Sequence, residues 1–314
     1  MSANLWIYIE HIEPAALGLL HKLRLMGESR GGIVTAVINE NCDSATVFSC
    51  GVKKIFRLLG RGDEKQVARQ IASLCREHTP DVMIFLATIS CRNIAAMLAA
   101  DLKTGLSADC TDINLRQDNI LVQTRPTFGG LLFADIICAD RRPQIATVRP
   151  GIFLTGQDTS LFPEDGEIID VHEAEIEACT KLLHVINTGL QPLSTARIVL
   201  SGGKGIKSSE GIKQLEKLAS LVGAAVGVSR GAVSAGYAQY GWQVGLTGQT
   251  IRPDIYIAFG ISGAVQHLVG MEGAKTIIAV NSDKNAQIFE YADIGIVSDW
   301  KPVVQKLIEY FEKK

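Results

Sequence analysis

The chain has 314 residues, enough for about two domains at one per ~150 residues, each with its own core. Its 31 Lys and Arg residues are balanced by 33 Asp and Glu, which gives a formal net charge of −2 and no basic stripe that would neutralise nucleic-acid phosphates. With 47% hydrophobic residues, 6% aromatic residues and 30 glycines, the composition indicates an α/β protein and argues against disorder and against a nucleic-acid partner.

The seven cysteines are scattered and never form a CxxC pair, so no zinc or iron–sulfur site is indicated and no metal is expected. The N-terminal MSANLWIYIEHI has no basic region typical of a signal peptide, and no apolar run approaches the ~18 residues that span a bilayer. We therefore expect a cytoplasmic protein with reduced thiols and no membrane insertion.

The first half alternates between strand and helix patterns. Apolar runs at residues 5–9, 33–37 and 82–87 predict strands, and the apolar face of DEKQVARQIASLCRE predicts a helix that ends before Pro80. Residues 113–136 alternate in hydrophobicity and contain turn glycines, which is typical of antiparallel strands. These patterns predict an N-terminal α/β domain with a β-rich portion.

A change in composition marks the middle of the chain. Residues 163–177 form an acidic segment that we predict lies on the surface, and NTGLQPLSTA at 187–196 collects the residues typical of a linker. We therefore predict two domains, 1–188 and 189–314.

The second domain begins with the strand pattern ARIVLSG. The helix that follows has apolar residues at helical spacing from Ile212 to Val222, with Ser209 as its expected cap and Gly223 just past its last turn. The chain ends in a helix that we expect to begin at Asp299.

Five predicted strands of this domain end in glycine-rich or polar loops: SGGKGIKS, VGVSRGAV, AFGISGAVQH, IAVNSD and GIVSDW. In a parallel sheet these loops lie along one edge, so the pattern predicts a doubly wound sheet with a nucleotide site. Neither GxxxxGK[ST] nor GxGxxG is present. The remaining expectation is that glycine amides and a helix N-terminus, best placed at GISGA, face an anion.

Several side chains near this edge are candidates for contact with a ligand. Arg230 could direct its charge at the ligand, or it could be a surface or phosphate-pairing arginine. His267 could contact the ligand or be structural, and the Thr247 hydroxyl could act on the ligand or belong to an ordinary turn. Asn281 and Asp299 follow strands, where each could bind ribose or adenine or cap a helix.

Together these loops, in order and spacing, resemble the FAD-binding domain of the electron transfer flavoprotein alpha subunit, and GLSADCTDI, TRPTFGG and RRPQIATVRPG extend the resemblance to the first half. The resemblance implies FAD as cofactor, a beta subunit as partner in a heterodimer, and an acyl-CoA dehydrogenase-type flavoenzyme as electron partner. It also implies that the FAD domain swivels on the linker near residue 190, and that the chain is a one-electron carrier rather than an enzyme on its own.

The resemblance also implies roles for individual residues. Ser262 and its neighbours would lie near the diphosphate, Arg230 against the isoalloxazine, His267 near N1 and the C2 carbonyl, and Thr247 within reach of N5. Since a flavin that gains an electron gains negative charge around N1, a guanidinium and a polarised or protonated imidazole would favour that state. The full implied set, in which Asn281, Asp299 and Trp300 contact the adenosine end, is Lys204, Ser229, Arg230, Val244, Gly245, Leu246, Thr247, Ser262, Gly263, Ala264, Val265, Gln266, His267, Asn281, Asp299 and Trp300.

The sequence departs from the family pattern at two positions and leaves alternatives open. Lys204 stands where the family usually has Arg, which removes a planar bidentate donor, and Leu246 stands where Gln is common. GLSADCTDI resembles the versions of anaerobes, which suggests a bifurcating complex linked to NADH and ferredoxin through a second FAD on the beta subunit. The rival classes are an NAD-binding dehydrogenase, which the missing GxGxxG disfavours, and a nonenzymatic adenine-nucleotide sensor, which would be colourless.

Overall fold

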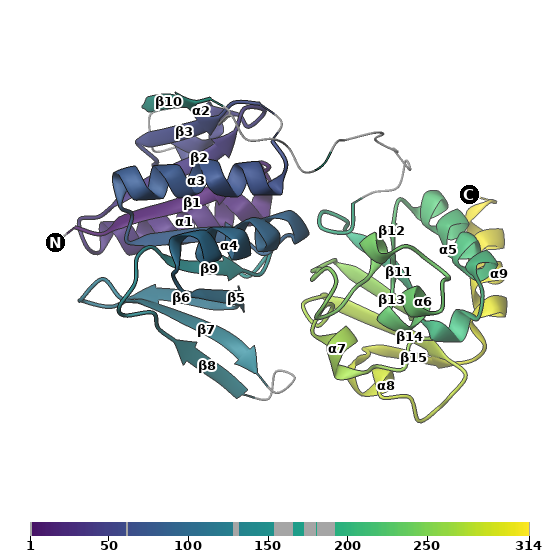
Figure 1. Cartoon of the computed structure of the whole chain (residues 1–314). Helices are drawn as coiled ribbons and strands as arrows, with labels where there is room; N and C mark the ends of the chain where they lie inside the picture. Colours follow the sequence, from purple (N-terminus) through teal and green to yellow (C-terminus); the bar gives the residue numbers. More distant parts are fainter. Residues whose placement is uncertain are drawn as a thin grey trace. The chain divides into compact units, whose positions relative to one another are not determined.

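The computed structural model describes residues 2–60, 62–127, 132–153, 166–172, 180 and 192–313. The chain divides into two compact units, Met1–Leu183 and His184–Lys314 (Figure 1). This division falls near the domain boundary predicted after residue 188. Residues 181–191 lie outside the described part of the chain, so half of the predicted linker at 187–196, and the swivel assigned to it, are not described.

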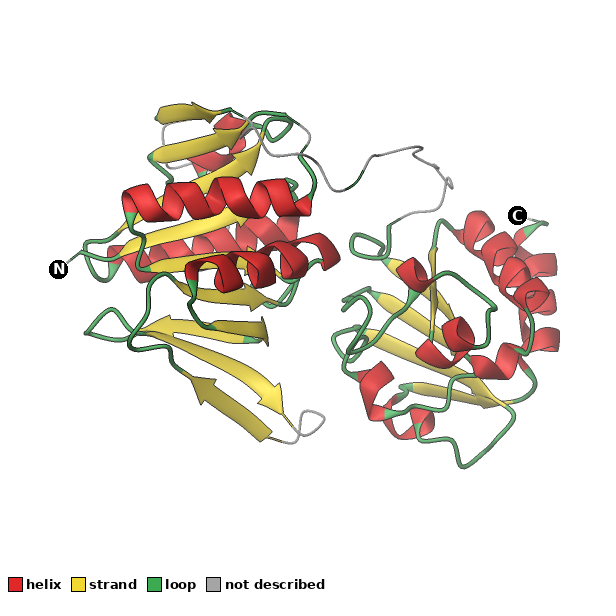
Figure 2. Cartoon of the chain, in the orientation of Figure 1, coloured by secondary structure: helices red, strands yellow, loops and turns green. Residues whose placement is uncertain are grey.

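The N-terminal unit is built on a seven-stranded parallel sheet with the order β10-β3-β2-β1-β4-β9-β5. Helices α1 and α2 cover one face and α3 and α4 the other, so that each face has its own apolar core (Figure 2). The elements are β1 (Asn4–Ile9), α1 (Pro14–Glu28), β2 (Ile33–Asn39), α2 (Ser44–Ser49), β3 (Lys54–Leu58), α3 (Glu64–His78), β4 (Val82–Leu86), α4 (Ile89–Leu102), β5 (Leu106–Cys110), β9 (Gln144–Val148) and β10 (Glu167–Val171).

The predicted β-rich stretch at 113–136 is an antiparallel three-stranded sheet of β6 (Asp112–Leu115), β7 (Leu121–Thr127) and β8 (Leu132–Ile136). The described part of the predicted acidic surface segment at 163–177 includes β10, an edge strand paired with β3 in which no residue is fully buried. Asp170 accepts two hydrogen bonds from Arg57 at 2.7 and 2.9 Å, while Ile169 and Val171 pack against the core. Residues 163–165 and 173–177 lie outside the described residues.

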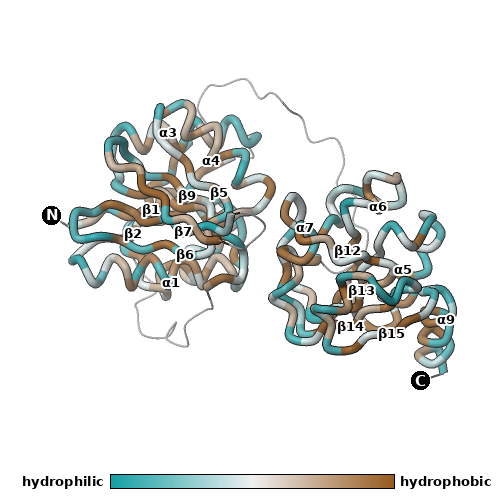
Figure 3. The backbone as a smooth tube through the Cα atoms, turned by 90° about the horizontal axis from the view of Figure 1, so that it is seen from below, coloured by the Kyte–Doolittle hydropathy of each residue, from teal (hydrophilic) through white to brown (hydrophobic). Residues whose placement is uncertain are grey.

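The second unit is a five-stranded parallel sheet with the order β12-β11-β13-β14-β15, which confirms the five predicted strands and the doubly wound fold. Helices α5 and α9 pack on one face, and α7 and α8 on the other. Figure 3 shows that hydrophobic residues are concentrated in strands such as β1 and β13, as expected for sheets covered on both faces. The elements are β11 (Ile198–Gly202), η2 (Lys204–Ile206), α5 (Ser209–Val222), β12 (Ala225–Val228), α6 (Arg230–Ser234), η3 (Tyr240–Trp242), β13 (Ile255–Phe259), α7 (Val265–Leu268), β14 (Thr276–Asn281), α8 (Ile288–Tyr291), β15 (Ile294–Val297) and α9 (Trp300–Phe311).

The helix ends follow ordinary capping chemistry, with one correction. Ser208, rather than the predicted Ser209, caps α5: its backbone is extended and its hydroxyl accepts from the Gly211 N–H at 3.1 Å. Gly223 ends this helix in the left-handed conformation, as predicted. Asp299 caps α9 by accepting from the Lys301 N–H at 2.8 Å. In the described part of the chain, no helix has the length and apolar character needed to cross a bilayer.

Candidate functional site

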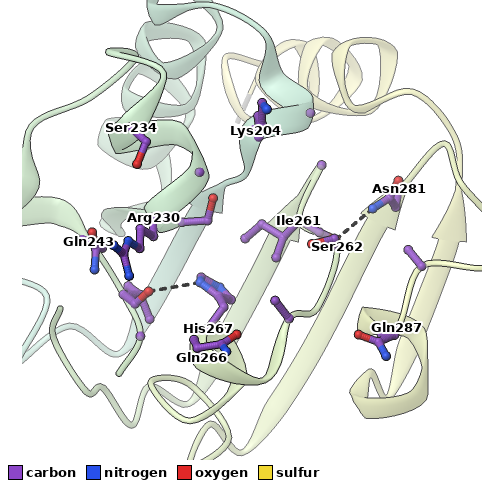
Figure 4. Close-up of a pocket in the computed structure, with 18 of the residues that line it drawn as sticks. Lys204, Arg230, Ser234, Gln243, Ile261, Ser262, Gln266, His267, Asn281 and Gln287 are labelled. Atoms are coloured by element: carbon purple, nitrogen blue, oxygen red, sulfur yellow. Dashed lines mark hydrogen bonds between the residues drawn. The ribbon is translucent and has the colours of Figure 1, made fainter. Parts of the chain in front are cut away.

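A cavity in the second unit opens at the carboxyl edge of its sheet and has a volume of about 880 Å³. Strand β11 lies between β12 and β13 in the sheet, so the crossovers that leave β11 and β12 run in opposite directions along it. This is the topological switch point, where open α/β sheets bind their ligands. Loops after β11, β12, β13 and β14 line the cavity, as the sequence predicted (Figure 4).

The cavity brings together most of the residues predicted for the site: Lys204, Ser229, Arg230, Val244, Gly245, Leu246, Thr247, Ser262, Ala264, Gln266, His267 and Asn281. It also includes lining residues that were not assigned individually, although the predicted GISGA segment and the other strand-end loops contain several of them: Gly205, Gly231, Ser234, Gln243, Gly260, Ile261, Asp283, Asn285, Ala286 and Gln287. The last four follow β14 directly, so the polar run NSDKNAQ was the signal that could have identified them.

Four predicted residues do not line the cavity. Asp299 and Trp300 follow β15, the edge strand farthest from the switch point, where Asp299 caps α9 and the Trp300 ring packs over Gly211. Gly263 is buried beneath α8, where a Cβ would come within 2.2 Å of the backbone nitrogen of Ile288. Each of these three residues therefore contacts another part of the same domain, and Asp299 has the helix-capping role that the sequence also allowed. The fourth, Val265, is 41% exposed on the first turn of α7.

The glycines of the β11 and β13 loops bring two backbones into contact. A Cβ on Gly203 would lie 2.0 Å from the carbonyl oxygen of Gly260, and the N–H of Gly205 donates to that oxygen at 3.0 Å. The Gly205 N–H is therefore already satisfied by the β13 loop and does not face an anion. After β13, helix α7 is a single turn, so only the first-turn amides of Val265 and Gln266 lack an intrahelical acceptor.

The loop at 243–249 forms one wall of the cavity and is held by hydrogen bonds at several points. The Leu246 N–H donates to the Gln266 carbonyl at 2.7 Å, which joins this wall to α7. The Gln243 side-chain Nε2 lies 2.8 Å from Thr247 Oγ1, and the Tyr240 hydroxyl donates to the Thr247 carbonyl. The Thr247 hydroxyl is therefore part of a braced loop rather than a free turn.

His267 lies beneath this wall and is only 6% exposed. Its Nδ1 is 3.1 Å from the Val244 carbonyl oxygen, a pure acceptor, so Nδ1 carries the proton and Nε2 accepts from the Tyr256 hydroxyl at 2.7 Å (Figure 4 labels His267). Burial lowers the pKa of His267 to about 4 and raises that of Tyr256. A protonated imidazole does not fit this environment, and both ring nitrogens are engaged within the domain.

The polar groups of the cavity suit an anionic ligand. Lys204 and Arg230 are exposed at its rim, and Asp283 is the one acidic residue among those that line it. The Ser229 hydroxyl accepts from the Ala232 N–H at 3.3 Å, which leaves its own hydrogen available to a ligand. The Asn281 side chain instead braces the β13 loop, because its Nδ2 donates to the Ile261 carbonyl at 2.8 Å.

A doubly wound domain with a polar, cation-lined cavity at its switch point is a nucleotide-cofactor domain. Residues 192–272 match the family described as "Electron transfer flavoprotein FAD-binding domain", and residues 9–176 match "Electron transfer flavoprotein domain". The chain belongs to the electron transfer flavoprotein alpha-subunit family, and its cofactor is FAD. The cavity fits this cofactor, since two cations suit a diphosphate and the volume lies in the range of cofactor sites.

Similarity to individual relatives extends over nearly the whole chain. It is 38% identical to "Electron transfer flavoprotein subunit alpha" of Thermoanaerobacterium thermosaccharolyticum, over 99% of this chain and 98% of the relative. It is 37% identical to the protein of the same name from Clostridium acetobutylicum, over 97% and 96%. It is 42% identical to "Protein FixB" of Clostridium saccharobutylicum, over 97% and 95%.

Proposed function

We propose that this chain shuttles single electrons between flavoenzymes, such as acyl-CoA dehydrogenases, and other redox partners. Residues 1–188 pair with a beta subunit, and residues 189–314 hold FAD in the cavity at the switch point. The observation that carries this proposal is the convergence of Lys204, Arg230 and Thr247, from three different loops, on that cavity. On the basis of its scattered cysteines we place the protein in the cytoplasm.

The chain's residues divide between binding and tuning. Ser262 and Lys204 are assigned to the diphosphate, and Arg230 is assigned to the ring, where its permanent charge favours added negative charge. Thr247 is assigned to N5. When bound, the flavin supplies the electron-transfer chemistry, while the protein sets its electronics through charges and hydrogen bonds near N1 and N5. His267 contributes indirectly, since its Nδ1–H holds the Val244 carbonyl and thus the wall of the site.

The cavity is poor in groups for substrate chemistry. Among the residues that the structure describes, no cysteine lines the cavity, its one histidine is neutral with both nitrogens engaged, and its one carboxylate, Asp283, lies on an exposed loop. These observations support an electron carrier over a dehydrogenase that activates its own substrate.

An anaerobic reductive titration of the chain copurified with its beta subunit, followed by visible absorbance, tests this proposal. A flavin reduced in two distinct one-electron stages supports the carrier. Direct two-electron reduction by NADH without the beta subunit would favour the dehydrogenase, and a colourless protein that also fails to take up added FAD would favour the nucleotide sensor. A second flavin that NADH reduces, coupled to reduction of ferredoxin, would identify the bifurcating form.

A further inference from the structure

Gln243 is a buried polar residue in the wall of the cavity, and the sequence patterns did not identify it. Its side chain is 2% exposed. Its backbone is fixed on both sides, because its N–H donates to the Tyr240 carbonyl at 2.9 Å and its carbonyl accepts from the Gln249 N–H at 2.7 Å. Gly248 packs directly on that carbonyl, since a Cβ there would lie 2.2 Å from it. Gln243 therefore has little freedom to move.

The contact between Gln243 and Thr247 has a defined direction. An amide nitrogen donates and does not accept, so Gln243 Nε2 donates to Thr247 Oγ1 at 2.8 Å. The Thr247 oxygen is thus the acceptor in this bond, and its own hydrogen must point elsewhere. A threonine hydroxyl hydrogen otherwise rotates to suit whatever lies nearby.

The loop backbone limits where that hydrogen can point. The Tyr240 hydroxyl already donates to the Thr247 carbonyl, and the loop is joined to α7 through Leu246 and Gln266. Thr247 is exposed and lines the cavity. With one side of its oxygen occupied from within the wall, the hydroxyl presents its hydrogen to the cavity.

We propose that Gln243 is a positioning residue that fixes the Thr247 hydroxyl as a hydrogen-bond donor toward the flavin. This inference rests on the proposed function, because it assumes that FAD lies in this cavity with N5 near Thr247. The oxidised N5 carries a lone pair and accepts a hydrogen bond, so a preoriented donor is matched to it without reorganisation of the site.

The test uses the heterodimer loaded with FAD labelled with ¹⁵N at N5, and measures the ¹⁵N chemical shift of the oxidised flavin. Thr247→Val should move this shift toward that of a flavin without a donor at N5. Gln243→Met should produce about half of that change, because the freed hydroxyl then points at the flavin only part of the time. Gln243→Leu is the second variant if Met disturbs the loop. Gln239→Met, at an exposed residue just before Tyr240 and outside the loop, should leave the shift unchanged.

Two combined variants separate positioning from a general effect on the loop. In a Thr247→Val background, Gln243→Met should add no further shift, because the hydroxyl that it orients is gone. Thr247→Ser alone should keep the wild-type ¹⁵N shift, because the hydroxyl and Gln243 are both present. The double variant Thr247→Ser with Gln243→Met should move the shift toward that of a flavin without a donor at N5. The inference is overturned if FAD is bound and Gln243→Met leaves the shift unchanged, or if the same change persists without the hydroxyl. Failure of wild-type protein to bind FAD would instead refute the proposed function.

Discussion

The buried pair of Tyr256 and His267 provides a quantitative test of the account. Tyr256 is fully buried and its hydroxyl is 2.7 Å from His267 Nε2. Tyr256→Phe keeps the ring and removes the hydroxyl alone, so no large cavity forms. It leaves Nε2 buried without its donor, because Nδ1 is already committed to Val244.

The expected cost follows from the energetics of a neutral, buried hydrogen bond. The bond itself contributes about 1 kcal/mol net, whereas leaving a buried acceptor unsatisfied costs about 1–3 kcal/mol. We therefore expect Tyr256→Phe to lower the free energy of unfolding of the FAD domain by about 2 kcal/mol. His267→Leu combined with Tyr256→Phe should cost less than the sum of the two single changes, since each removes the partner of the other.

Hydrogen exchange read by mass spectrometry suits this measurement, because peptides from β11 and β13 report the opening of this domain separately from the N-terminal unit. Tyr291→Phe, at a tyrosine that is 49% exposed, is the matched control and should change exchange little. If Tyr256→Phe alters the opening free energy by less than about 0.5 kcal/mol, as surface changes do, the argument for a required donor to Nε2 fails.

Three further predictions concern charge, backbone space and pH. Burial lowers the pKa of His267 from 6.5 to about 4, so the unfolded chain binds this proton more readily between those pH values. The free energy of unfolding of the domain should therefore fall by about 3 kcal/mol as the pH drops from 6.5 to below 4. A His267 ring that titrates near 6.5 by NMR would contradict this. Gly263 has a φ of +88°, and a Cβ there would lie 2.2 Å from a backbone nitrogen. Gly263→Ala should therefore lower the opening free energy measured by hydrogen exchange by more than about 2 kcal/mol, whereas Gly241→Ala, with open space around it, should change it little. Equal effects of the two changes would show that the close packing at Gly263 does not matter. Arg230→Ala should lower the flavin potential by on the order of 30 mV in a reductive titration, and Arg230→Lys by less; an unchanged titration would remove Arg230 from redox tuning.

Much of the site was predictable because its residues lie in loops that directly follow recognisable strand patterns. Each loop follows an apolar strand pattern, and parallel strands place their carboxyl ends on one edge, so Lys204, Arg230 and Ser262 could be grouped without a structure. Strand order cannot be read from such patterns. The sequence could not show that β15 is the edge strand of the sheet, and it left open whether Asp299 caps α9, as the structure shows it does.

The remaining differences come from contacts between distant segments. β10 reads as an acidic surface run, and its identity as a strand depends on pairing with β3 more than a hundred residues earlier, including the contact of Arg57 with Asp170. The neutral state of His267 depends on its burial in the folded domain, where Tyr256 of strand β13 also contacts its Nε2. Gln243 was missed for the same kind of reason, since only the folded loop brings its amide to Thr247.

The measurement that tests the central claim most directly is FAD binding to a variant whose cavity is filled. Ser262 is exposed in the cavity, so Ser262→Trp should occupy the space of the ligand. Ser220→Trp is the control, because it adds the same side chain on the exposed face of α5, outside the cavity. By fluorescence titration the wild type and Ser220→Trp should bind one FAD per chain, and Ser262→Trp should lose about 100-fold or more in affinity, about 2.7 kcal/mol. Undiminished binding by a folded Ser262→Trp protein would show that FAD lies elsewhere and would contradict the account.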